Sequence, residues 1–499
     1  MVGEIHSFLL VASCTLVSSS RPHIIFILAD DLGWSDVGYH GSVIKTPHID
    51  ALASEGVKLD NYYTSLLCTP SRSQLMTGRY EIHTGLQHRT IDMMQPLCLP
   101  IDETILPQKL KDRGYATHMV GKWHLGFYRQ ECLPNNRGFD TFMGFYQAMG
   151  DYYYHNVSTG KFNGWDFRRD NDVIAERYAG QYSTHVFADE ARDIISKHNP
   201  DVPLFLFLSF QAIHFPLQVP SRYADIYNTL IPNSADRRTY AGMVTCMDEA
   251  VGGVVATLKH SGLWENSVLV FSTDNGGIHS LGGNWPLRGG KASLYEGGVR
   301  GVAFVTSPLL PSRVRGTINK ELLHMTDWFP TLVRLAGGHL MGNKRLDGYN
   351  QWDTISQETP SLRNEILLTI NPLKRKPNHF VDDPYADTDS FDILMRAAIR
   401  VGDWKLITGP TGNGSWVTPA EFGFNSLHPE ERTHSVELYN VIADPNERHD
   451  YSRDRPDIVG ALLDRIGHYY KTSVPVLNPP QEVTRADPAL HGGAWSPWR

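Results

Sequence analysis

Four apolar runs in the first 300 residues constrain the fold most, because each has the length of a strand and several end directly in polar residues. The runs are His23–Ala29, Tyr115–Val120, Leu204–Phe210 and Ser267–Thr273. Helical patterns lie between them, notably His48–Glu55 and Tyr240–His260, and the second carries an apolar stripe at helical spacing. Strand runs that alternate with helices predict an α/β fold.

The pattern changes near Pro360. Four further short runs indicate strands: Glu365–Ile370, Ala397–Val401, Trp404–Thr408 and Glu437–Asn440. A helix is expected over Asp457–Tyr470, which makes this part a small antiparallel domain with one helix. The polar stretch Asn371–Ser390 is interpreted as a long loop, and its basic cluster, Lys374–Lys376, as solvated. We therefore expect a large domain over residues 21–360 and a C-terminal subdomain over 361–499.

The N-terminus and the overall charge bear on the compartment and on partners. Residues Phe8–Val17 are apolar and lead into Ser18–Ser20, which indicates a secretory signal peptide over residues 1–20, although Glu4 and the lack of basic residues make a poor start for one. This segment is too short to span a bilayer, so no membrane span is expected. A formal charge of −8 with no long basic run argues against a nucleic-acid binder.

Oxygen-bearing side chains follow two of the strand runs. Asp30 and Asp31 follow the first run, and Asp274 and Asn275 follow the fourth. Strand ends of this kind can meet in one crevice, and carboxylate and amide oxygens are ligands for a hard cation, with Ca²⁺ favoured over zinc. Each pair alone fits an ordinary turn better than a metal site. Together, and with Cys68, they indicate a metal site.

The segment Cys68–Arg72 places a thiol at the start of a helix beside a positive charge. Thr69 can cap that helix, Pro70 suits its first turn, and the free amides with Arg72 form a pocket for an anion. An isolated cysteine here would more often be a buried structural residue. Other candidates for an anion clamp or a proton donor occur in polar stretches, several just past strands: Lys122, His124, His214 and Lys291.

The remaining cysteines indicate the redox environment. Cys246 lies on the apolar stripe of its helix and is interpreted as a buried free thiol. Cys98 and Cys132 lie in loop-like contexts and could bridge in an oxidising compartment. Asn156 and Asn413 begin glycosylation sequons.

The run from Cys68 to Arg79 resembles the signature of the type I sulfatases, in which this cysteine is oxidised after translation to formylglycine. The resemblance extends from Arg21 almost to the C-terminus and is greatest to the arylsulfatase B group of N-acetylgalactosamine-4-sulfatases. It also rests on Thr84–His88, Gly121–Gly126, Arg137–Asp140, Ser272–Gly277, Asn284–Gly289 and Glu296–Gly301. The chain departs from that group in having fewer cysteines and in having Phe215 after His214, where the group has an acidic residue.

The resemblance implies both a fold and a set of site residues. It implies a large mixed sheet flanked by helices, of the alkaline-phosphatase type, with residues 21–360 as the catalytic domain. It implies Ca²⁺ ligands at Asp30, Asp31, the converted Cys68, Asp274 and Asn275. The residues around the formylglycine and the sulfate would be Arg72, Lys122, His124, His214 and Lys291.

The activity implied by the resemblance is hydrolysis of sulfate esters. The expected substrate is a sulfated sugar such as N-acetylgalactosamine 4-sulfate in chondroitin or dermatan sulfate. A formylglycine-generating enzyme is the expected maturation partner, and the expected location is lysosomal or secreted. The alternatives are a phosphatase or phosphodiesterase of the same superfamily, a catalytically inactive glycan-binding relative, and an enzyme that stays cytosolic and unconverted.

Overall fold

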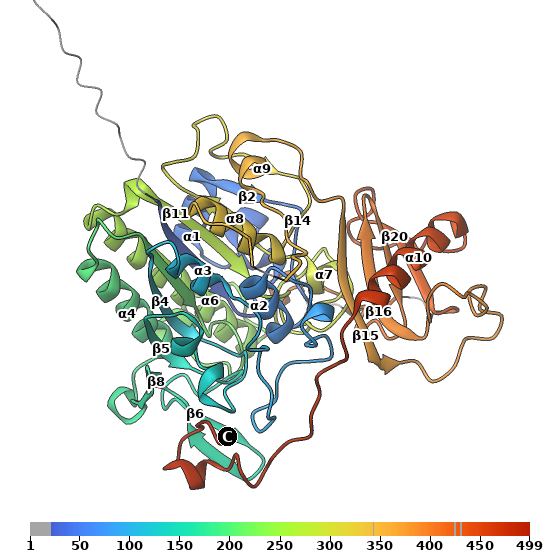
Figure 1. The fold of residues 1–499 in the computed structure, drawn as a ribbon. Coiled ribbons are helices and arrows are strands. Elements are labelled where there is room, and N and C mark those ends of the chain that lie inside the picture. Colours follow the sequence, from blue (N-terminus) through green and yellow to red (C-terminus); the bar gives the residue numbers. More distant parts are fainter. Residues whose placement is uncertain (1–20, 343, 424–425, 430–431) are drawn as a thin grey trace, which may run out of the picture.

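A computed structural model describes residues 21–342, 344–423, 426–429 and 432–499, so the expected signal peptide lies outside the described residues. The main body is built on a ten-stranded mixed sheet with the order β13-β2-β12-β11-β1-β10-β4-β5-β8-β9 (Figure 1). The strands are β1 His23–Ala29, β2 Val57–Leu59, β4 Ala116–Lys122, β5 Thr141–Phe145, β8 Arg168–Arg169, β9 Asp172–Val173, β10 Leu204–Ser209, β11 Ser267–Thr273, β12 Ala303–Thr306 and β13 Ile318–Asn319. The five strands from β11 to β5 run parallel, whereas β12 pairs antiparallel with β11.

The central strands are buried on both faces, which is why they are apolar without alternation. Successive side chains of β1 enter two different cores, with Ile25 and Ile27 in one and Phe26 and Leu28 in the other. The first core is covered by α1 Pro47–Glu55, α4 Ser183–Lys197 and α6 Ala235–His260. The second is covered by α2 Cys68–Thr77, α3 Leu106–Lys111 and α8 Trp328–Leu335.

The remaining elements of this body are short. They are α5 Ser221–Asp225, α7 Glu296–Val299, α9 Trp352–Gln357, the pair β3 Tyr62–Tyr63 with β14 Leu323–His324, the pair β6 Asn156–Thr159 with β7 Phe162–Trp165, and β18 Trp416–Val417 with β19 Ser426–Leu427. The long helix α6 is apolar and long enough to cross a membrane by composition alone, but 67% of its apolar window is buried inside the fold. Its packing against α1, α4 and α5 is that of a core helix.

A second, four-stranded antiparallel sheet follows, as the sequence predicts. It has the order β15-β16-β17-β20, formed by Glu365–Arg375, Met395–Val401, Trp404–Thr408 and Val436–Asn440. Helix α10, Pro456–Thr472, packs on one face, while the other face packs on the main body through Tyr63 and Tyr295. Strand β15 is longer than expected, so Lys374 and Arg375 belong to a strand and not to a loop.

The chain does not end in the C-terminal subdomain. After α10 it returns along the main body and finishes near β6 (Figure 1). The amide of Val474 donates to the carbonyl of Ile82, and the amide of Trp495 donates to that of Trp165. The expected boundary at residue 360 stays a prediction. The segment after α10 belongs to the expected C-terminal subdomain by its position in the sequence, but it packs on the main body and not on the small sheet.

Two expectations about cysteines are confirmed. Cys98 and Cys132 form a disulfide with a Cα–Cα distance of 6.0 Å. Cys246 is a buried free thiol on α6, and its sulfur lies 3.2 Å from Nε2 of His185.

Candidate active site

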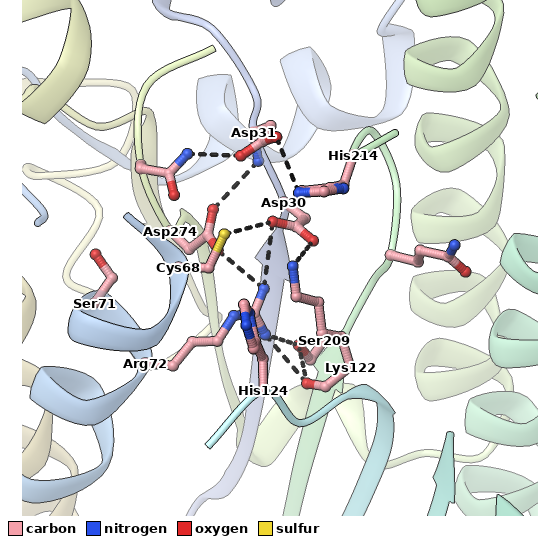
Figure 2. A network of polar contacts seen from close by, with 12 residues as sticks. Asp30, Asp31, Cys68, Ser71, Arg72, Lys122, His124, Ser209, His214 and Asp274 are labelled. Carbon is pink, nitrogen blue, oxygen red and sulfur yellow. Dashed lines mark hydrogen bonds and ion pairs between the residues drawn. The ribbon is translucent and has the colours of Figure 1, made fainter. Parts of the chain in front are cut away.

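The carboxyl ends of four neighbouring parallel strands meet at one place, where their polar residues form a single network (Figure 2). Strand β1 leads into Asp30, β4 ends at Lys122, β10 ends at Ser209 and β11 leads into Asp274. The strand order β11-β1-β10-β4 places these ends side by side. The convergence expected from the sequence is therefore present.

The metal-ligating atoms expected from the sequence are close together and fully buried. One ligand atom each from Asp30, Asp31, Cys68 and His214 lies within 4.8 Å of the others. Asp274 borders this group, because its Oδ1 accepts a hydrogen bond of 3.2 Å from the amide of Asp31. The arrangement thus brings the expected carboxylates together and adds His214, which the sequence suggested only as a proton donor.

Asn275 tests whether these residues suit a cation. Its Nδ2 donates to Oδ1 of Asp31 at 2.7 Å and to the carbonyl of Gly276 at 3.0 Å. Its Oδ1 is buried and has no hydrogen-bond partner among the described residues. A buried oxygen without a donor is unfavourable, but a hard cation is a suitable partner for it. The donor set therefore fits Ca²⁺.

Cys68 begins α2, and its sulfur lies 3.6 Å from Oδ1 of Asp30. Burial raises the pKa of this thiol, so it is a neutral thiol and not a nucleophilic thiolate. The expected cap is wrong, because Leu67 occupies the N-cap position without a side-chain bond. Thr69 instead donates from Oγ1 to the carbonyl of His124 and accepts from the amide of Ile91, which ties α2 to two loops of the site.

The expected anion pocket at Arg72 stays a prediction, and in the structure this side chain is engaged by its neighbours. It is fully buried, and its NH2 pairs with Oδ2 of Asp274 at 3.0 Å. Its NH1 donates to Ser209 at 2.7 Å and to the carbonyl of Lys122 at 3.1 Å. Arg72 therefore positions these residues. Sequence reasoning missed Ser209, although it is the one polar residue in an otherwise apolar run.

Two lysines neutralise the carboxylates. Nζ of Lys122 contacts Oδ2 of Asp30, and Nζ of Lys291 lies 2.6 and 2.7 Å from the two oxygens of Asp31. Lys122 is completely buried, whereas Lys291 is partly open. Together with Arg72, which pairs with Asp274, these lysines balance the three carboxylates of the site, so its net charge is close to zero.

The carboxyl groups differ in their pKa values because their partners differ. Burial raises the pKa of Asp30 to about 7 in spite of Lys122. Burial would also raise the pKa of Asp31 and of Asp274, but Lys291 and Arg72, respectively, outweigh it and lower both.

Two histidines face the network. Nδ1 of His214 lies 2.9 Å from the carbonyl oxygen of Phe215, within hydrogen-bond distance. Its Nε2 lies 3.7 Å from Oδ2 of Asp31. Burial, reinforced by Lys291, lowers its pKa to about 3. His124 is buried with neither ring nitrogen hydrogen-bonded to any described residue, and burial followed by Lys122 lowers its pKa strongly. Both rings can therefore accept a polar group placed beside residue 68.

A sulfatase family model matches residues 22–338, which include every candidate site residue. The chain belongs to the sulfatase family. Its members hydrolyse sulfate esters, so this chain is a sulfuric ester hydrolase, and the predicted fold class is confirmed.

Relatives cover most of the chain. Arylsulfatase J of Mus musculus is 48% identical over 489 residues, which are 96% of this chain and 81% of the relative. N-acetylgalactosamine-6-sulfatase of Mus musculus is 29% identical over 354 residues, with 67% and 66% covered. The crystal structure of Ps i-CgsB in complex with k-i-k-neocarrahexaose has a TM-score of 0.76 at 26% identity, with 95% and 98% covered. The expected special likeness to the arylsulfatase B group stays a prediction.

Proposed function

We propose that this sulfatase hydrolyses the sulfate ester of a sulfated sugar, with Cys68 converted to formylglycine and Ca²⁺ bound beside it. The observation that carries this proposal is the set of unsatisfied buried atoms around residue 68. Oδ1 of Asn275 lacks a donor, and both ring nitrogens of His124 lack partners among the described residues. Buried polar groups are normally paired, so these atoms indicate a site that is completed by a cation and an oxygen-rich ligand.

The calcium ion and the formylglycine would each have a defined role at this site. Ca²⁺ would be held by Asp30, Asp31, Asp274 and Asn275, and would supply positive charge beside the sulfate oxygens. Formylglycine at position 68 would supply, as its hydrate, a hydroxyl nucleophile that the neutral thiol cannot replace.

The chain's own residues orient the sulfate and move protons. Lys122 and Lys291 both act electrostatically on Cys68, since their charges oppose the rise of its pKa, and both offer donors to sulfate oxygens. His214 keeps Nε2 directed at the site because Nδ1 is engaged by the carbonyl of Phe215. We assign Lys291, or His214 once its Nε2 has taken up a proton, to the proton given to the departing alcohol oxygen, and His124 to the proton taken from the hydroxyl at position 68.

The substrate proposal is N-acetylgalactosamine 4-sulfate in chondroitin or dermatan sulfate. It is supported by the likeness to an N-acetylgalactosamine-6-sulfatase and to a protein crystallised with a carrahexaose. We also propose a lysosomal or secreted location, which the Cys98–Cys132 disulfide supports because such bonds persist in oxidising compartments. Maturation would need a formylglycine-generating enzyme.

The test combines mass spectrometry with sulfate release. Protein secreted from cells that contain the converting enzyme should carry an aldehyde in the Cys68 peptide and should release sulfate from 4-nitrophenyl sulfate. Cys68→Ala protein, made in parallel, should do neither. Efficient hydrolysis of 4-nitrophenyl phosphate without sulfate release would favour the phosphatase alternative. A correctly folded wild-type protein with the aldehyde and calcium but without any turnover would favour the inactive glycan-binding alternative.

A further inference from the structure

Gln147 carries a buried side-chain amide that is unpaired among the described residues. The side chain is 3% exposed, its Nε2 is buried, and it makes no hydrogen bond within the part of the chain that the structure describes. Apart from arginine Nε atoms, only three described residues bury a nitrogen without a partner: His124, Gln147 and His324. His324 still bonds Thr326 through its other ring nitrogen, at the turn before α8. A buried donor without an acceptor is unfavourable, which indicates that a ligand of Gln147 supplies the acceptor.

Gln147 follows β5, the strand next to β4 in the sheet. Lys122, the last residue of β4, pairs in parallel register with Phe145, the last residue of β5. Beyond this pair, the amide of His124 donates to the carbonyl of Tyr146 at 3.1 Å, so the backbone just before Gln147 is bonded to that of His124. The carboxyl ends of parallel strands meet at one edge of a sheet. Gln147 therefore lies at the same crevice as Lys122 and His124.

The alternation of side chains places Gln147 and Lys122 on the same side of the sheet. Met143 and Phe145 of β5 enter the first core, and so does Val120 of β4. Successive side chains of a strand point to opposite faces, so the positions two residues further along, Gln147 and Lys122, keep that side. The unpaired amide and the site lysine therefore approach the crevice from one side.

The backbone around Gln147 is fixed to the neighbouring segments of the site. Oδ2 of Asp166 accepts a hydrogen bond of 2.9 Å from the amide of Gln147. Five residues further on, the hydroxyl of Tyr152 donates to the carbonyl of His214 at 2.8 Å. The segment that begins at Gln147 therefore joins the loop of His124 to the loop of His214.

The position of the amide suits the alcohol part of a bound ester and not its sulfate. Lys122 has a longer side chain, which brings its Nζ to Oδ2 of Asp30, beside Cys68. In the order β1-β10-β4-β5, Gln147 begins one strand further from β1, about 4.8 Å, and its side chain is shorter. Its Nε2 therefore stops short of a sulfate beside residue 68 and lies on the side to which the rest of the ester can extend.

We propose that Gln147 is a specificity-determining residue, which donates a hydrogen bond from Nε2 to an oxygen of the sulfated sugar ring. The inference deepens the proposed function and rests on it, because the sulfate must be bound beside residue 68. The acceptor is a hydroxyl or acetamide oxygen, and 4-nitrophenyl sulfate has neither. A sugar ester thus makes a contact in the site that a simple aromatic ester does not make, and a site built to bond a substrate oxygen discriminates against analogues without it.

The experiment compares three esters in the converted, calcium-loaded enzyme: N-acetylgalactosamine 4-sulfate, galactose 4-sulfate and 4-nitrophenyl sulfate. Gln147→Met keeps the length of the side chain and removes the donor. Gln181→Met is the matched control, because Gln181 is exposed and its Nε2 donates to the carbonyl of Arg177 at 3.4 Å. We measure kcat and KM for each ester, and the Tm of each protein without substrate.

Gln147→Met should lower kcat/KM for the sugar esters about tenfold more than for 4-nitrophenyl sulfate, the size of effect expected for one lost hydrogen bond. A differential loss confined to N-acetylgalactosamine 4-sulfate identifies the acetamide oxygen as the acceptor, and a similar loss for both sugars identifies a hydroxyl. Gln181→Met should leave the ratios between the esters unchanged. The Tm of Gln147→Met should not fall, because the amide that it removes has no partner among the described residues.

Equal losses for all three esters would overturn the proposal, because they would place the amide on the sulfate or in the folding of the site. The absence of any loss would overturn it too, as when the amide binds only a water, and a fall in Tm of several degrees would show a structural role instead. So would a wild-type enzyme that hydrolyses 4-nitrophenyl sulfate but neither sugar ester count against it. Failure of the proposed function itself would appear separately, as a wild-type enzyme that hydrolyses none of the three esters.

Discussion

Replacing Lys405 tests most directly how the C-terminal sheet is fixed to the main body. Its Nζ lies 3.0 Å from Oε1 of Glu296 and 2.9 Å from Oε1 of Glu447, and all three side chains are fully buried. Glu296 also accepts from Tyr63, and Glu447 accepts from the amide of Glu296. Lys405→Met keeps the length of the side chain but leaves two buried carboxylates facing each other.

The expected loss is large for one side chain. Breaking a buried ion pair by removing one partner costs about 3–5 kcal/mol. With an unfolding entropy of about 2.1 cal/mol/K per residue, a chain of 499 residues changes its Tm by about 1 °C per kcal/mol, so Tm should fall by roughly 3–5 °C.

The loss should depend on pH in a defined direction. Burial raises the pKa of Glu447 from 4.5 to about 7 even in the presence of Lys405, so its contribution to stability is complete below about 4.5 and is lost as pH rises through 7. Without the lysine, both carboxyl groups take up protons more readily, which relieves their repulsion in acid. The Tm loss of Lys405→Met should therefore be larger at about pH 8 than at about pH 5.

Differential scanning calorimetry at both pH values is the assay. Lys197→Met is the control, because Lys197 forms an exposed pair with Asp193 and should change Tm very little. Adding Glu447→Gln to Lys405→Met should recover part of the loss at the higher pH. Equal losses at both pH values, or a loss no greater than that of the control, would refute the reasoning.

Three further predictions concern the site and the surface. Asp31→Asn should weaken Ca²⁺ binding, measured calorimetrically, together with sulfate release, because it removes one of three clustered carboxylates; full activity in metal-stripped Asp31→Asn protein would contradict the metal assignment. Cys68→Ser should gain the mass of one sulfate on the peptide containing residue 68 and then stall, whereas Cys68→Ala should gain none; turnover of Cys68→Ser at the wild-type rate would rule out the formylglycine route. Protonation of the 22 histidines in acid offsets the formal charge of −8, so acid should strengthen the binding of sulfated polyanions in a salt-sensitive way. Salt-insensitive turnover of chondroitin oligosaccharides, or a neutral pH optimum, would count against this.

The sequence predicted the parts of the fold that depend on local pattern. The apolar runs gave β1 and β11 at their observed bounds, because strands buried on both faces are continuous hydrophobic stretches. Strand β15 was underestimated, since its outer end is polar and is paired only through irregular register with β16. The returning tail left no periodic signal, because it is held by separate backbone hydrogen bonds and not by an amphipathic face.

At the site, residue types were easier to predict than pairings. Asp30 and Asp274 could be found because each follows a strand run, and neighbouring parallel strands bring such positions together. The sequence could not show that Arg72 forms an ion pair with Asp274, or that Thr69 donates a hydrogen bond to a loop carbonyl instead of capping α2.

The packing of α2 against the main body would set a time limit on the proposed conversion of Cys68. The side chain is 1% exposed in the folded protein, so an enzyme that modifies it needs the segment before α2 is enclosed. The helix packs against α8 and the turn before it, Met325–Asp327, which are synthesised about 250 residues later. At about 5–20 residues per second, the ribosome needs roughly 10–50 s to make that stretch. During this interval α8 and the turn before it do not yet exist, so the order of synthesis would leave this side of α2 uncovered for a converting enzyme.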